Sequence, residues 1–151
     1  MPFLEFWLTP ISILIAAASL FFGIYIYRKQ TNIQIFLDFT KRYEGIMDSF
    51  PNDTVFYRLS TDMEPPPESK ELTLAVLKYL NLCSEEYYLM EEKLLSKKLW
   101  NIWKDELENI LQSKLVRREW PKIKNEYSAY KEFQMYVDDL IKLQTKSTSK
   151  F

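Results

Sequence analysis

The sequence contains no histidine, a single cysteine and only two glycines in 151 residues. Without histidine, neither imidazole acid–base chemistry nor histidine ligation of a metal is available. One cysteine excludes an internal disulfide and a cysteine-rich zinc site. Gly23 and Gly45 stand alone, so the glycine-rich turns that bind nucleotides in P-loops and dinucleotide folds are absent. We therefore predict that the protein is not an enzyme and uses neither a cofactor nor a metal.

Cys83 lies at helical spacing among Val76, Leu80 and Tyr87. A thiol in such a stripe is typical of a hydrophobic core, whereas a nucleophilic cysteine needs a partly exposed, electropositive surrounding. We expect Cys83 to be a buried core residue.

The chain has, by contrast, a long run without any charge. Residues 6–27, FWLTPISILIAAASLFFGIYIY, number 22, and a transmembrane helix needs about 20. A cleaved signal peptide would carry Lys or Arg ahead of the run, but the only charged side chain there is Glu5. Arg28 and Lys29 follow the run, so the positive-inside rule predicts an outside N-terminus and a cytoplasmic C-terminal part. We expect one uncleaved anchor in the inner (cell) membrane, with the lipid bilayer as a partner.

Four small residues lie on one face of this predicted helix. Ser12, Ala16, Ser19 and Gly23 are separated by four, three and four positions. Small residues let two transmembrane helices approach closely, although they are also common in such helices without that role. We predict a homo-oligomer packed through this stripe, with a tetramer as one candidate.

Beyond the anchor, apolar residues recur every three or four positions, and no stretch alternates with period two. The pattern predicts a helix after the membrane that ends near residues 49–53, and later helices over about 69–93, from the cap Ser96, and from Pro121. The side chains expected to face inward include Ile33, Phe36, Phe39, Tyr43, Ile46, Val76, Leu80, Cys83, Trp100, Trp103, Leu107, Ile123, Tyr127, Tyr130, Val137, Leu140 and Ile141.

The sequence thus indicates an all-α protein with one N-terminal transmembrane helix and a cytosolic bundle of about four helices. The stretch TDMEPPPES is acidic and rich in proline, which excludes regular structure. We divide the chain into a transmembrane anchor (1–30), a stalk with a turn (31–60), a proline-rich linker (61–69) and a cytosolic helical domain (70–151).

Charge is sorted along the chain. From Glu44 to Glu92 there are eleven acids and three bases, whereas from Lys93 to Lys124 there are nine bases and four acids. Such an asymmetry is a clue to binding partners. The segment VRREWPKIK concentrates four of these bases around a tryptophan and a proline.

Two lysine pairs fall at predicted helix starts. Lys97 and Lys98 follow Ser96, and Lys122 and Lys124 follow Pro121. Cations are disfavoured there by roughly 0.3–1 kcal/mol each, because the helix dipole is positive at that end. A bound anion would reverse this effect. With Trp120 exposed to stack on a base, the hypothesis is a polyanion site formed by Arg117, Arg118, Trp120, Lys122, Lys124, Lys97 and Lys98.

A purely structural interpretation stays open. Lys97 and Lys98 can pair with Glu91 and Glu92, and Glu119 can offset the neighbouring arginines. The basic segment can also dock on the acidic segment within the same bundle.

The run LKYLNLCSEEYYLMEEKLLSKKLWNIWKDELENIL, followed by REWPKIKNEYSAYKEF, resembles a family of small prokaryotic proteins with one N-terminal transmembrane helix and a helical domain of unknown function. In size, topology and basic–aromatic patch the chain also resembles the membrane-anchored effectors of type III CRISPR systems. That resemblance implies an antiviral sensor that binds a cyclic oligoadenylate, such as cyclic tetra-adenylate, or another polyanion, but no duplex nucleic acid, and then acts on the membrane. The alternative is a membrane-tethered helical adaptor that docks a protein partner without a small ligand.

Overall fold

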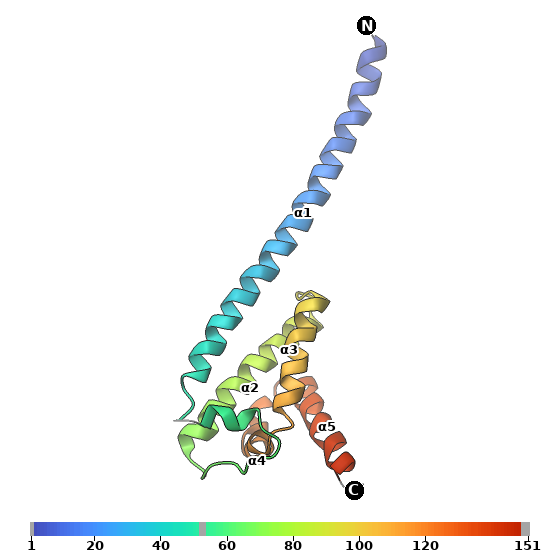
Figure 1. Ribbon diagram of the computed structural model, residues 1–151. Helices are drawn as coiled ribbons and strands as arrows, with labels where there is room; N and C mark the ends of the chain where they lie inside the picture. Colours follow the sequence, from blue (N-terminus) through green and yellow to red (C-terminus); the bar gives the residue numbers. More distant parts are fainter. Residues whose placement is uncertain (1, 52–53, 149–151) are drawn as a thin grey trace. The chain divides into compact units, whose positions relative to one another are not determined.

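A computed structural model describes the backbone of residues 2–51 and 54–148 and the side chains of residues 10–51 and 54–142 (Figure 1). The chain divides into two compact units, Met1–Leu37 and Asp38–Phe151. The boundary between them falls inside the segment that the sequence predicts as a stalk.

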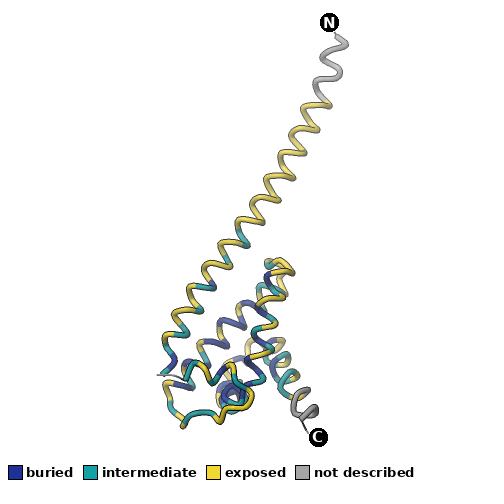
Figure 2. The backbone as a smooth tube through the Cα atoms, viewed as in Figure 1, coloured by how far each residue is buried: buried dark blue, intermediate teal, exposed yellow. Residues whose placement is uncertain are grey.

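The first unit is part of a single helix, α1 (Pro2–Met47), whose 46 residues give it a length of about 70 Å. Residues 10–30 are exposed throughout (Figure 2). The part from Pro10 onward is long and apolar enough to cross a membrane, and its most apolar stretch is not buried at all. One long apolar N-terminal helix is therefore present, as the sequence predicts.

The second unit is formed by the end of α1 and six further helical segments. These are η1 (Thr54–Arg58), α2 (Lys70–Glu91), α3 (Lys97–Ile110), α4 (Lys114–Ile123), η2 (Lys124–Tyr127) and α5 (Lys131–Thr148). The part of the chain that the structure describes contains no strand, so the all-α prediction is confirmed.

Serine side chains set the starts of three helices. The Ser69 hydroxyl accepts from the Leu72 amide at 3.1 Å, and the predicted cap Ser96 accepts from Leu99 at 3.3 Å. Such bonds satisfy an amide that the first helical turn would otherwise leave without a partner.

The prediction of a helix that begins at Pro121 is wrong. The Ser113 hydroxyl accepts from the Val116 amide at 3.2 Å and starts α4 one residue later, so Pro121 lies near the end of that helix. Proline has no amide to continue the ladder, and the chain tightens into η2 directly afterwards. Lys122 consequently lies in the last turn of a helix, where a cation is favoured.

The core of the second unit joins α2, α3, α4, η2 and α5 (Figure 2). Val76, Leu80, Cys83, Leu107 and Val137 are buried in it, as predicted.

Three expected core residues are exposed instead. Tyr130 is 51% exposed, because Tyr127 fills the core position at the end of η2 and α5 then begins at Lys131. Ile33 and Phe36 are 52% and 40% exposed, and both belong to the first unit, where no second layer covers them.

Candidate functional site

Helix α4 is two-sided, with a core face and a basic face. Its basic face carries Lys114, Arg117, Arg118 and Lys122. The opposite side is buried and consists of Leu115, Val116, Glu119, Trp120 and Ile123. Val116, Trp120 and Ile123 are spaced by four and three positions, which fixes this orientation and turns the basic face away from the core.

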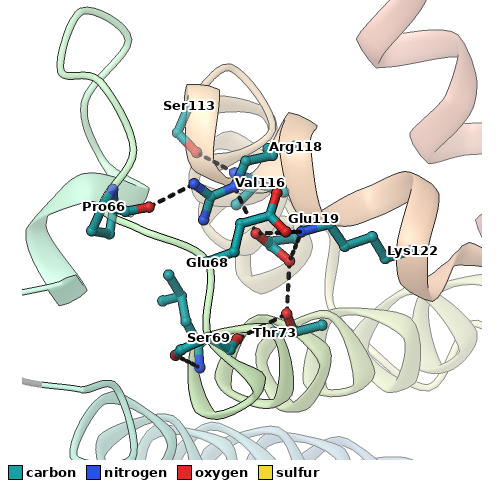
Figure 3. Close-up of polar contacts among 10 residues, drawn as sticks. Pro66, Glu68, Ser69, Thr73, Ser113, Val116, Arg118, Glu119 and Lys122 are labelled. Carbon is teal, nitrogen blue, oxygen red and sulfur yellow. Dashed lines mark hydrogen bonds and ion pairs between the residues drawn. The ribbon is translucent and has the colours of Figure 1, made fainter.

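The acidic linker, residues 61–69, covers the basic face. Lys114 forms an ion pair with Glu64 and donates to the Asp62 carbonyl at 3.3 Å. Arg118 Nη1 donates to the Pro66 carbonyl at 2.6 Å, and Lys122 Nζ lies 3.0 Å from Glu68 Oε2 (Figure 3). The basic segment therefore docks on part of the acidic segment within the same unit, which is the structural interpretation that the sequence left open.

Glu119 is the centre of this network. It is fully buried and accepts hydrogen bonds from Thr73 Oγ1 at 2.8 Å, Arg118 Nε at 2.7 Å and Lys122 Nζ (Figure 3). Burial by itself raises the pKa of this carboxyl, but the three hydrogen bonds outweigh it and hold the pKa below the ordinary value. The carboxylate thus stays ionised and joins α2 to α4. In the sequence, the signal for this structural role is that Glu119 lies among the apolar residues of the α4 core face.

Arg118 is incompletely satisfied by these partners. Its Nη2 is buried and has no hydrogen-bond partner among the described residues. A buried donor without a partner costs about 1–3 kcal/mol.

Trp120 is only 3% exposed. Its Nε1 donates to Asp138 Oδ1 at 2.7 Å, and its ring packs against Tyr127 with centroids 5.4 Å apart. The expectation that this ring is exposed to stack on a ligand is wrong, because Trp120 follows Val116 by one helical turn and so shares its core face.

The seven predicted site residues do not form one patch. Lys97 and Lys98 are exposed in the first turn of α3, and among the described residues they form no ion pair with Glu91 or Glu92. They begin α3, whose 14 residues span about 21 Å and end before α4 starts. Arg117 Nε donates to the Leu111 carbonyl at the end of α3, at 3.4 Å.

Lys124, the last of the seven, begins η2 and is partly buried there.

The four residues of the predicted oligomerisation stripe are exposed on α1: Ser12, Ala16, Ser19 and Gly23. A Cβ added at Gly23 meets no atom within 4 Å, so nothing within one chain requires glycine there.

No family model, curated protein or solved structure matches this chain. Function therefore has to follow from the residues themselves.

A second buried acid lies where the end of α1 packs on α2, and sequence reasoning missed it. Glu86 is 8% exposed, and burial together with the nearby carboxylates of Glu106 and Glu85 raises its pKa to about 8. Arg42 is bound by Glu85 in a two-point contact of 2.5 and 2.7 Å. Glu86 follows Cys83 by one turn, so its position on the apolar stripe was the available signal.

Cys83 is 2% exposed, as expected for a core thiol, and burial raises its pKa well above the ordinary value. A thiol in this state is a poor nucleophile.

A shallow pocket of about 450 Å³ lies beside the linker at the start of α2. Its lining includes Glu68, Thr73 and Lys122, which already belong to the network around Glu119.

Proposed function

We propose that this protein is a single-pass membrane protein with its N-terminus outside and its helical unit in the cytoplasm, where that unit docks a protein partner. The observation that carries the proposal is the complete exposure of the uncharged residues 10–27, in a chain whose second unit has a buried core of its own. An apolar helix of this length is stable in lipid and unstable in water. Arg28 and Lys29 directly after it favour a cytoplasmic location for the rest.

Membrane fractionation tests the anchor. The full chain should stay with the membrane after an alkaline wash, and a C-terminal tag should be digested by protease only when the cytoplasmic face is accessible. Release by the wash would contradict an anchor. Digestion from the outer face alone would contradict the orientation.

A docking face is offered by η1. Phe56 on η1 is 65% exposed, and Leu59, the residue directly after η1, is 57% exposed. The Leu59 amide donates to the Phe56 carbonyl at 3.2 Å, so the 3₁₀ turn continues to Leu59 and aligns the two side chains. Arg58 on the same segment is buried, donates to the Tyr43 hydroxyl and to Met47 Sδ, and so holds η1 against the end of α1. Exposed aromatic and aliphatic side chains on a fixed backbone are typical anchors of protein interfaces.

Site-specific photo-crosslinking in native membranes tests this face. A crosslinker at position 56 or 59 should give one discrete product of higher mass, whereas one at the exposed Asn81 should not. Phe56→Ser should remove the product formed from position 59. Equal products from 59 and 81 would show non-specific contact and contradict the docking face.

A second candidate, a ligand-gated sensor in a homo-oligomer, is favoured by Arg118. Its Nη2 is buried without a partner, and its Nη1 is held by a neutral carbonyl where a phosphate would bind more strongly. A cyclic oligoadenylate or another polyanion would displace the acidic linker and shift the population of anchor arrangements in the membrane. Such a mechanism matches the resemblance to the type III CRISPR effectors.

Thermal unfolding of the detergent-solubilised chain with cyclic tetra-adenylate tests this candidate. At a hundredfold excess over the dissociation constant, a ligand adds about 2.7 kcal/mol of stability. Glu64→Gln with Glu68→Gln should tighten binding because the linker competes less, and Arg118→Glu should abolish it. Absence of any shift in both the wild type and the linker variant would exclude the sensor.

A further inference from the structure

Helices α2 and α3 are joined by a tight turn, and residues 91–98 form what we call the α2–α3 tip. Lys93 is in the left-handed region, with φ of 57°, and it is the only non-glycine residue with positive φ in the described part of the chain. Its amide donates to the Met90 carbonyl and the Leu94 amide donates to Leu89, each at 2.9 Å. Glycine is the usual residue at this helix end, so a lysine here is a locally unfavourable choice.

The same tip contains two more unfavourable choices. Leu94 is 55% exposed, and Lys97 and Lys98 occupy the positive end of the α3 dipole. Among the described residues, none of the tip's three lysines forms an ion pair, so the fold does not compensate for them. Residues that lower the stability of the fold without compensating contacts are expected where they serve a function.

The chemistry of the tip suits one kind of surface. In sequence, an exposed leucine lies between Lys93 and the pair Lys97 and Lys98. Glu91, the last residue of α2, and Glu92, its C-cap, leave the tip one excess positive charge. Lysines bind lipid phosphates while an aliphatic side chain between them enters the headgroup layer.

The position of the tip within its unit also favours contact with a membrane surface. The end of α1 and α2 run in opposite directions, with Arg42 paired to Glu85 and the Tyr43 ring against Tyr79 (Figure 1). The tip therefore lies at the end of the unit at which α1 enters. Asp38 follows Arg28 by ten positions, about 15 Å as helix, which keeps the unit close to the bilayer whatever the angle between the two units.

We propose that the α2–α3 tip binds the anionic cytoplasmic surface of the membrane, with Leu94 among the headgroups and Lys93, Lys97 and Lys98 on lipid phosphates. This contact rests on the proposed membrane anchor. It gives the helical unit a second point of attachment and so restricts its orientation above the bilayer.

A fluorescent label at the tip tests the contact. The only native cysteine is buried, so Leu94→Cys in the full chain can be labelled selectively with a polarity-sensitive dye. In phosphatidylcholine vesicles containing an equal amount of phosphatidylglycerol, the emission should shift to the blue relative to vesicles of phosphatidylcholine alone. High salt should reverse the shift.

Charge reversal tests whether the blue shift depends on the lysines of the tip. Lys97→Glu with Lys98→Glu should abolish the blue shift, whereas Lys78→Glu with Lys131→Glu, the same change at exposed lysines elsewhere, should preserve it. Loss of the shift in both variants would overturn a tip-specific contact.

Three other outcomes would also overturn it. Resistance to the alkaline wash together with equal emission in the two kinds of vesicle would contradict the tip contact and would be consistent with the anchor. A blue shift produced by soluble polyphosphate without vesicles would identify a site for a free anion. Release of the protein by the wash removes the anchor and the contact together.

Discussion

At the scale of single residues, the two buried acids Glu86 and Glu119 differ because their partners differ. Glu119 accepts three hydrogen bonds, which lower its pKa, so it remains a carboxylate. Glu86 is buried near two other acids, and Arg42 offsets their effect only in part, so its pKa is raised to about 8. Glu119 therefore holds α4 to α2, whereas Glu86 makes stability sensitive to pH.

We predict that Glu86→Gln removes a pH dependence of stability. A carboxyl whose pKa is raised by folding contributes stability that is fully present below its ordinary value of 4.5 and is lost as pH rises through about 8. The wild type should lose a few kcal/mol over this range, on the order of 1.4 per pH unit at most, and the variant should not. Urea unfolding at several pH values measures this difference.

Glu119→Gln is the matched control. Its folded pKa is lowered, so its contribution is present above the ordinary value and is lost as pH falls through the folded pKa. This variant should be destabilised at neutral pH by about 3 kcal/mol, because the half-buried Arg118 loses its ion pair with a fully buried carboxylate. Parallel pH profiles for the wild type and Glu86→Gln would contradict the assignment of Glu86.

Lys93→Gly is predicted to raise the free energy of unfolding by about 1 kcal/mol, because glycine adopts positive φ without strain. Urea titration measures the gain. Lys78→Gly, in the middle of α2, should instead lower stability by about 1 kcal/mol. A loss at both positions would mean that φ at Lys93 carries no strain.

At the scale of elements, the sequence was sufficient where the signals are local. Ser96 and the apolar stripe of α2 were read correctly because caps and periodicity involve neighbours within one or two turns. The start of α4 is not among the predicted helix starts, because the prediction relied on Pro121, a common helix-start residue, and did not include Ser113. Partners such as Thr73 and Glu119, 46 positions apart, depend on how α2 packs on α4, and no one-dimensional pattern contains that.

Ser113→Ala is predicted to destabilise the unit by about 2 kcal/mol, at the upper end for an N-cap, because Ser113 is fully buried. Ser96→Ala removes an equivalent bond at an exposed position and should cost about 1 kcal/mol or less. Denaturant unfolding of both variants gives the comparison. A smaller loss at Ser113 than at Ser96 would contradict the role of Ser113 in starting α4.

At the scale of the whole molecule, we predict association through the stripe on α1. Ala16→Ile with Gly23→Ile should reduce the assembly size in detergent, measured by light scattering, while membrane insertion is retained. Within one chain a Cβ added at Gly23 meets no atom within 4 Å, so we expect the effect to arise from a second copy. Ala18→Ile, on the other side of the helix, should leave the size unchanged. An unchanged size in the double variant would show that the stripe is incidental.

The distribution of the core along the chain has a consequence for synthesis. Residues 6–27 leave the ribosome before the core from Phe50 to Val137, and that core lacks its contribution from α5 until Phe133 and Val137 have been made. In a membrane-anchored chain, insertion is therefore committed before the helical unit can fold. The unfinished unit would then wait at the membrane surface with Phe39 and Tyr43 uncovered, and its core would be completed only once α5 has been translated.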